Sequence, residues 1–263
     1  MPLRNLKTLS LEGEFRHLFG LLRQLILPEA LDEVYLSGLK STVHDVPQTL
    51  APYMRDYFRR DTRFRNRLEI SPSFSTHSIL VSVDVVCTQT TAPVQKQPRV
   101  TFGVILASPP PDVLKRFFID FITPLPREHI VSLKDRRNKK LPEELFFMMP
   151  NIETLRIHCV RLSEGFLRPN PDGLHANAKL LPSLRSLSLE GVNLNDNNLG
   201  HLTKYLAHRT SDNQTISLEV RGYSRYSRQK VANEVKGLVE EFTLYLKPVG
   251  RAWRDQVDWF RPV

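Results

Sequence analysis

The segment Leu181-Pro-Ser-Leu-Arg-Ser-Leu-Ser-Leu-Glu-Gly191 indicates the fold most clearly, because a near copy of it lies at Leu3–Gly13. Seven of the eleven positions are identical in the two copies, which begin 178 residues apart. Both have the spacing Leu-x-x-Leu-x-x-Leu-x-Leu, and the alternation at its end predicts a β-strand with one apolar face. The two copies therefore predict similar strands at distant points of the chain.

The same spacing recurs between and after the two copies. Leu31-x-x-Val34-x-Leu36 follows the first copy after 25 residues, and Ile152-x-x-Leu155-x-Ile157 precedes the second. A looser version is Ile216-x-Leu218-x-Val220. Intervals of 25 to about 30 residues are typical of leucine-rich repeats, whose units must stack because none covers its own apolar side. The sequence predicts an α/β fold: an irregular leucine-rich-repeat solenoid, with a curved, mostly parallel sheet and helices on the convex side.

Helical periodicity separates the predicted strands. Apolar residues at intervals of three and four, in places preceded by proline and acidic residues, predict helices. These predicted helices cover residues 15–26, 111–122, 141–149, 197–208 and 229–246. The stretch 163–180 is predicted to be a loop. We expect the solenoid to span residues 1–246 and residues 247–263 to form a C-terminal tail.

The middle of the chain has a different composition. Residues 78–87 and 99–107 are rich in β-branched side chains and predict strands longer than a leucine-rich repeat needs. A polar link over 88–98 joins them. The β-rich part at about 60–110 therefore has two interpretations: degenerate repeats with extended strands, or a hairpin inserted into the stack.

Composition restricts the cellular setting. The chain has 263 residues, a formal net charge of +9 and only two cysteines, Cys87 and Cys159. Both lie in apolar, strand-like runs, as buried free cysteines do, whereas secreted repeat proteins usually carry more cysteines in disulfides. No apolar run follows Met1, and no stretch approaches 18 apolar residues. We expect an intracellular protein, cytoplasmic or nuclear, with no membrane contact.

No catalytic motif is recognisable. The sequence lacks a glycine-rich phosphate loop, a Gly-x-Ser-x-Gly elbow and a His-Glu-x-x-His motif. The Asn- and Asp-rich stretch 193–198 lacks the glycine and terminal glutamate of a calcium loop. It is better interpreted as a polar turn that caps the next helix. We therefore predict no enzyme activity, no cofactor and no metal site.

The candidate binding surface is the concave face of the predicted sheet. Every second residue of a repeat strand points away from the core, so the outward residues of stacked strands form one surface. Tyr35 and Arg156 are the best anchor candidates by residue type. The full set for the four clear repeats is Thr8, Ser10, Glu12, Glu33, Tyr35, Ser37, Thr154, Arg156, His158, Ser186, Ser188 and Glu190.

Three basic clusters support an alternative, a nucleic-acid-binding module. They lie at residues 55–67, 134–140 and 221–230, and aromatic residues stand among the cations in the first and third. Aromatic rings can stack on bases while cationic groups contact phosphates. Acidic residues interrupt the first two clusters, and such runs are also common on solvated surfaces or where an acidic protein binds.

The repeats at 3–13, 149–162 and 181–199 resemble those of intracellular F-box-type leucine-rich-repeat proteins. Leu187–Leu199 is similar to their Leu-x-Leu-x-Gly-Cys-x-x-Leu-Thr-Asp-x-x-Leu motif, with Val192 in place of the cysteine. Over most of its length the chain resembles the C-terminal region of F-box/leucine-rich-repeat-like proteins abundant in mushroom-forming fungi. The resemblance implies the substrate-recognition part of a cullin-type ubiquitin-ligase adaptor. Since the repeat pattern starts at Leu3, we expect this chain to lack the F-box itself.

Overall fold

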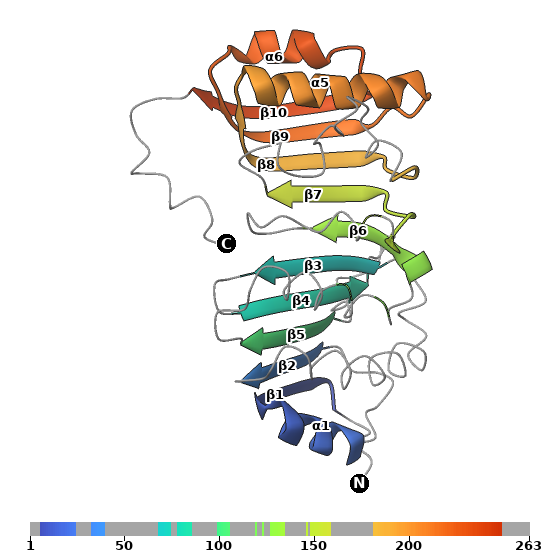
Figure 1. Ribbon diagram of the computed structural model, residues 1–263, viewed down its shortest axis with the longest axis vertical. Helices are drawn as coiled ribbons and strands as arrows, with labels where there is room; N and C mark the ends of the chain where they lie inside the picture. Colours follow the sequence, from blue (N-terminus) through green and yellow to red (C-terminus); the bar gives the residue numbers. More distant parts are fainter. Residues whose placement is uncertain are drawn as a thin grey trace.

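A computed structural model gives the fold. It describes residues 6–24, 33–39, 68–74, 78–85, 99–105, 119, 123, 127–134, 146, 148–158 and 181–248. These residues form a mixed α/β structure whose strands lie side by side in a single long sheet (Figure 1).

Ten strands build the sheet. In chain order they are β1 (Thr8–Glu14), β2 (Glu33–Leu39), β3 (Leu68–Phe74), β4 (Ser78–Val85), β5 (Arg99–Ile105), β6 (Ile130–Lys134), β7 (Thr154–His158), β8 (Ser186–Leu194), β9 (Ser217–Ser224) and β10 (Glu241–Pro248). The described helices are α1 (Phe15–Gln24), α5 (Asp196–Ser211) and α6 (Arg228–Val235), with a short 3-10 turn, η2, at Arg127–His129.

The strands lie side by side in the order β1-β2-β5-β4-β3-β6-β7-β8-β9-β10. Of these ten, β4 alone runs against the others, because it pairs antiparallel with both β3 and β5. The predicted middle strands therefore belong to the main sheet. Of the two interpretations of this region, the antiparallel β4–β5 pair agrees with the inserted hairpin.

The strand registers align one apolar residue of every strand. Each member of this apolar row pairs with the next across the sheet. In spatial order the row is Leu9, Val34, Val100, Val83, Ile70, Leu133, Leu155, Leu187, Leu218 and Phe242. Leu9, Ile70 and Leu187 are among its buried members, with exposed fractions of 0–8%, whereas Phe242 at the end is 39% exposed.

Helix α5 covers this apolar side near the C-terminal strands, through Leu199, Leu202 and Leu206. It begins at a side-chain cap, because Asn195 Oδ1 accepts a hydrogen bond from the Asn198 amide at 2.9 Å. Its last turn carries Arg209, which is 1% exposed. The Arg209 guanidinium donates to the carbonyls of Leu181 and Leu184, both at 3.0 Å, and so fixes the turn before β8.

The bulge in β8 depends on a glycine in the neighbouring strand. The β8–β9 register shifts between Glu190 and Val192, which brings the Val192 backbone against Gly222. A Cβ at Gly222 would lie 2.0 Å from the Val192 carbonyl oxygen. Only glycine fits this approach without moving the backbone.

The predicted helix at 229–246 is wrong in its second half. Helix α6 ends at Val235, and residues 241–248 form β10. Gly237 takes a φ of +86°, a conformation that ends a right-handed helix. Beyond it, Phe242, Leu244 and Leu246 alternate with polar residues and pair in register with β9. Strand periodicity supported by a neighbouring strand therefore prevails over the helical spacing.

The other predicted elements have mixed outcomes. The helices at 15–26 and 197–208 are confirmed as α1 and α5, while β3 and β6 were not predicted. Most of 111–122 and 141–149, and the loop 163–180, lie outside the described residues. Strand β10 extends to Pro248, two residues into the predicted tail, and 249–263 also lie outside them. No helix among the described residues is long and apolar enough to cross a membrane.

Candidate functional site

The face opposite the apolar row carries polar residues along its whole length. A second register row lies one position before the apolar row in the nine parallel strands and one position after it in the reversed strand β4, and all ten of its members are polar. In spatial order this polar row is Thr8, Glu33, Arg99, Asp84, Glu69, Ser132, Thr154, Ser186, Ser217 and Glu241. Because neighbouring positions on a strand point to opposite faces, these residues define a polar face on the side opposite the core.

The structure divides the twelve predicted surface residues into two groups on this face. The first six pair between β1 and β2, for example Ser10 with Tyr35. The other six pair between β7 and β8, for example Arg156 with Ser188. Strands β5, β4, β3 and β6 lie between the groups. With strands about 4.8 Å apart, β2 and β7 are separated by roughly 24 Å.

Exposure on the polar face also differs between its ends and its middle. Thr8, Ser10 and Thr154 are exposed, and Tyr35 is partly buried. In the middle, Ser71 and Ser132 are only 3% and 6% exposed. Both donate to the Glu69 carboxylate, Ser132 at 3.0 Å and Ser71 at 3.4 Å. Among these residues, the exposed ones lie on β1 and β7, whereas Ser71, Ser132 and also Ser188 of β8, at 6%, are covered.

A charged network occupies the polar face over β7, β8 and β9. Arg156 Nε lies 3.1 Å from Glu190 Oε1, and a terminal nitrogen of Arg156 lies 3.6 Å from Glu219 Oε2. The Ser188 hydroxyl donates to Glu219 Oε2 at 3.0 Å. Arg221 donates to Glu219 Oε1 through Nε at 2.8 Å and pairs with it through Nη2 at 2.7 Å. Two cations and two carboxylates are thus held in one arrangement.

The network stabilises both charged partners at its centre. Partial burial by itself raises the pKa of Glu219, but hydrogen bonds from Arg221 and Ser188 and the charges of Arg221 and Arg156 lower it below its ordinary value. The hydrogen bond with Glu219 likewise raises the pKa of Arg221, despite partial burial. The Arg221 guanidinium lies 4.8 Å from the centre of the Tyr245 ring, a cation–π distance.

Glu219, Arg221 and Tyr245 are members of this surface that the predicted set omits. Glu219 stands between Leu218 and Val220, and Arg221 follows Val220, so the alternation of the looser repeat at 216–220 already placed both on the polar face. Tyr245 was missed because its segment was predicted to be helical. His158, which was predicted, lies against the backbone of Gly191: a Cβ there would be 2.9 Å from its ring carbon Cε1.

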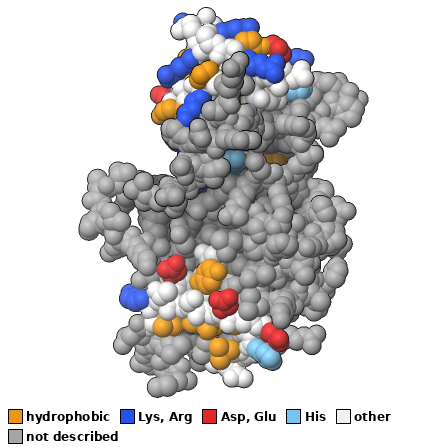
Figure 2. Space-filling view, turned by 90° about the vertical axis from the view of Figure 1, so that its left-hand side faces the viewer, with side chains coloured by type: hydrophobic (Ala, Val, Ile, Leu, Met, Phe, Trp, Pro, Cys, Tyr) orange, Lys and Arg blue, Asp and Glu red, His pale blue; other side chains and the backbone are white. Residues whose placement is uncertain are grey.

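The basic clusters are only partly described. Cluster 55–67 lies outside the described residues, as does 134–140 except for Lys134. In the third cluster Arg225 and Arg228 are exposed, and Lys230 Nζ lies 3.9 Å from the centre of the Tyr226 ring. Figure 2 faces the side toward which the parallel strands point. Lys and Arg side chains gather at its top, over the C-terminal elements, whereas acidic and apolar side chains mark the described surface at its bottom.

The stretch 193–198 has the role predicted for it as a cap. Asn195 caps α5, and the Asn198 side-chain amide donates to the Asn193 carbonyl. Within the described ranges, no group of three or more His, Cys, Asp or Glu side chains is placed to hold a metal ion.

Comparison with known proteins adds no assignment: no protein-family model, curated protein or solved structure matches this chain.

Proposed function

We propose that this chain is a non-catalytic protein-interaction module, an irregular leucine-rich-repeat solenoid that binds a protein partner on its polar face. The main support is the unbroken polar row across ten strands, with side chains exposed near both of its ends. A ligand that touches both ends must span more than the roughly 24 Å between β2 and β7. A macromolecule can span that distance, whereas a small molecule is too short.

The charges favour a protein over other macromolecules at this face. Along the chain of contacts, Glu190, Arg156, Glu219 and Arg221 alternate in sign, and each is held by its neighbours before any partner binds. A surface of mixed sign matches the mixed charges of a protein surface, whereas a polyanion would meet the two carboxylates. Because the side chains are already ordered, binding costs less conformational entropy.

The test is capture from cell extract with variants of the two exposed regions. We expect the wild-type chain to retain a protein that is lost with Tyr35→Ala/Arg156→Glu, and also with Ser10→Arg/Thr154→Arg, which places bulky cations on the polar face. Gln24→Arg on the exposed surface of α1 is the matched control and should retain the partner. Circular dichroism would confirm folding of each variant. Capture that is unaffected by both polar-face variants would remove this site assignment.

Within this function, we propose that the chain serves as the substrate-recognition part of an F-box-type ubiquitin-ligase adaptor. The support is the similarity of its repeats to that class. If so, the reading frame upstream of Met1 encodes an F-box in the complete gene, and the captured protein is ubiquitinated in a manner that depends on the adaptor. An upstream sequence without an F-box, combined with unchanged ubiquitination when the chain is depleted, would contradict this role but not partner binding.

Nucleic-acid binding is the second candidate, favoured by the exposed cations and the ring contact at Tyr226. It predicts affinity for RNA or DNA that falls steeply with salt, since phosphate contacts release counterions. Arg225→Glu/Arg228→Glu should abolish a gel shift that the wild type gives at low salt, while Glu234→Gln on α6 should not. No shift at low salt would eliminate this candidate.

A further inference from the structure

Strand β10 is the last strand of the described sheet, and its outer edge carries exposed side chains. It pairs with β9 on one side, and in the described part of the chain no strand pairs with its other side. Glu241, Phe242, Thr243 and Tyr245 are exposed, with Phe242 at 39% and Tyr245 at 55%. An edge strand of eight residues with exposed aromatic side chains is a template for pairing with another strand.

The apolar side of β10 is covered by α6 at Leu244 but not at Phe242. Val231 and Val235 of α6 are buried in the same cluster as Leu244, which is 1% exposed. Phe242 belongs to the apolar row, yet it is far more exposed than the buried members of that row. The apolar row therefore ends in a side chain that another strand would bury.

We propose that β10 pairs antiparallel with β10 of a second copy, around a two-fold axis through Leu244. This surface is additional to the polar face. The sequence Glu-Phe-Thr-Leu-Tyr-Leu-Lys247 is complementary to itself when reversed. Glu241 then stands opposite Lys247 of the second copy, and Phe242 opposite Leu246. Thr243 faces Tyr245, and Leu244 meets its own counterpart.

Other pairings of β10 with itself fit less well. A parallel, in-register pair would place Glu241 against Glu241 and Lys247 against Lys247, which is repulsive. In antiparallel pairs, directly opposite residues share a face, so a shift by one position would set apolar residues against polar ones. A shift by two positions would leave both Glu241 and Lys247 without an opposite charge. The register centred on Leu244 alone matches all seven positions.

A two-fold axis perpendicular to the sheet keeps both polar faces on the same side. The sheet then continues through both copies, and the interface uses the same patch on each, as in most two-fold dimers. A partner with two binding epitopes could engage both polar faces, so dimerisation would raise its apparent affinity without any new contact type.

The test is analytical ultracentrifugation over a range of protein concentrations with charge-reversed variants. We expect a concentration-dependent dimer for the wild type. Glu241→Lys and Lys247→Glu should each weaken self-association about tenfold or more, because each dimer contains the altered pair twice. An equimolar mixture of the two variants should recover the dimer, since every cation again faces a carboxylate.

The recovery in the mixture separates loss of pairing from loss of folding. Lys236→Glu, an exposed charge reversal just beyond α6, is the matched control and should dimerise as the wild type does. A wild type that stays monomeric at all concentrations would overturn the proposal. So would a dimer whose affinity neither variant changes, or two weakened variants whose mixture stays monomeric.

Discussion

The middle and the C-terminal half of the sheet bury their apolar sides in the same row but connect their strands differently. From β6 to β10 the chain order equals the spatial order and all strands are parallel. Between β2 and β6 the chain instead places β3 next to β6 and returns through β4 and β5. The composition also differs: β8 is rich in leucine, whereas β4 and β5 are rich in valine and isoleucine.

What the two regions share is the register. One apolar row and one polar row run through both without interruption, although β4 is reversed. Side chains alternate between faces in either strand direction, so a reversed strand keeps its apolar side on the core when its register is right. Alignment of the rows, and not uniform connections between strands, therefore produces the continuous polar face.

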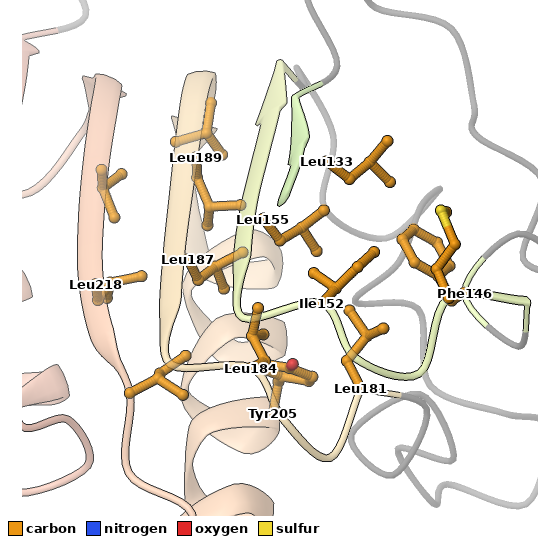
Figure 3. Packing of buried hydrophobic residues seen from close by; sticks show 14 of the residues in the cluster. Leu133, Phe146, Ile152, Leu155, Leu181, Leu184, Leu187, Leu189, Tyr205 and Leu218 are labelled. Atoms are coloured by element: carbon orange, nitrogen blue, oxygen red, sulfur yellow. The ribbon is translucent and has the colours of Figure 1, made fainter. Parts of the chain in front are cut away.

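The largest expected effect comes from the middle of the C-terminal apolar row. Leu187 is 0% exposed and lies beside Leu155 and Leu218 (Figure 3). Leu187→Ala should lower the free energy of unfolding by about 4 kcal/mol, and Leu9→Ala, at the 8% exposed start of the row, by about 2 kcal/mol. Urea denaturation would measure both. Equal losses would mean that the row is equally well packed at Leu187 and at Leu9.

The next effect tests how α5 stabilises the C-terminal region. Leucine would replace the apolar stem of Arg209 but would remove the guanidinium that donates to the carbonyls of Leu181 and Leu184. Buried carbonyls without donors are costly, so Arg209→Leu should reduce the free energy of unfolding by about 3 kcal/mol. Lys204→Leu, on the exposed side of α5, is the control and should change it by less than about 0.5 kcal/mol. Similar losses for both would refute the role of Arg209.

A smaller loss of stability is expected at Gly191, the last residue of the second copy of the repeated segment. Gly191 has a φ of +70°, and an added Cβ would lie 2.9 Å from the His158 ring. Gly191→Ala should therefore destabilise the fold by about 2 kcal/mol, part of it from backbone conformation and part from the ring contact. Adding His158→Ala should recover only the second part. Full recovery in thermal or urea unfolding would show that backbone conformation contributes nothing.

The smallest effect concerns the pH dependence of the charged network. Because the folded-state pKa of Glu219 is lowered, its contribution to stability is present above the unfolded-state pKa of about 4.3 and is lost as the pH falls through the folded value. Between pH 7 and pH 3, the wild type should lose up to about 1 kcal/mol more stability than Glu219→Gln, since the pairs are partly exposed.

Unfolding series at several pH values would measure this difference. Glu240→Gln, exposed in the turn before β10, is the control and should follow the wild type. A wild type and a Glu219→Gln variant with parallel pH profiles would contradict a stabilising role for the network.

Much of the candidate site could be read from repeat spacing alone. Alternation in the clear repeats identified Arg156, Ser188 and Glu190, which contact one another or Glu219 in the folded chain. Glu219 and Arg221 follow from the same alternation in the looser repeat. Tyr245 could not be found this way, because the helical spacing predicted a helix over 229–246, where a strand forms beside β9.

The sequence by itself determined which residues of each strand are apolar and which are polar, because that alternation is local and has a period of two. Only the tertiary structure decided the spatial order of β5, β4 and β3, the direction of β4 and the conversion of 241–248 into a strand. These depend on hydrogen bonds between strands far apart in the chain, and no local period specifies which strands pair. Contacts such as Arg221 with Tyr245 exist only because that pairing brings them together.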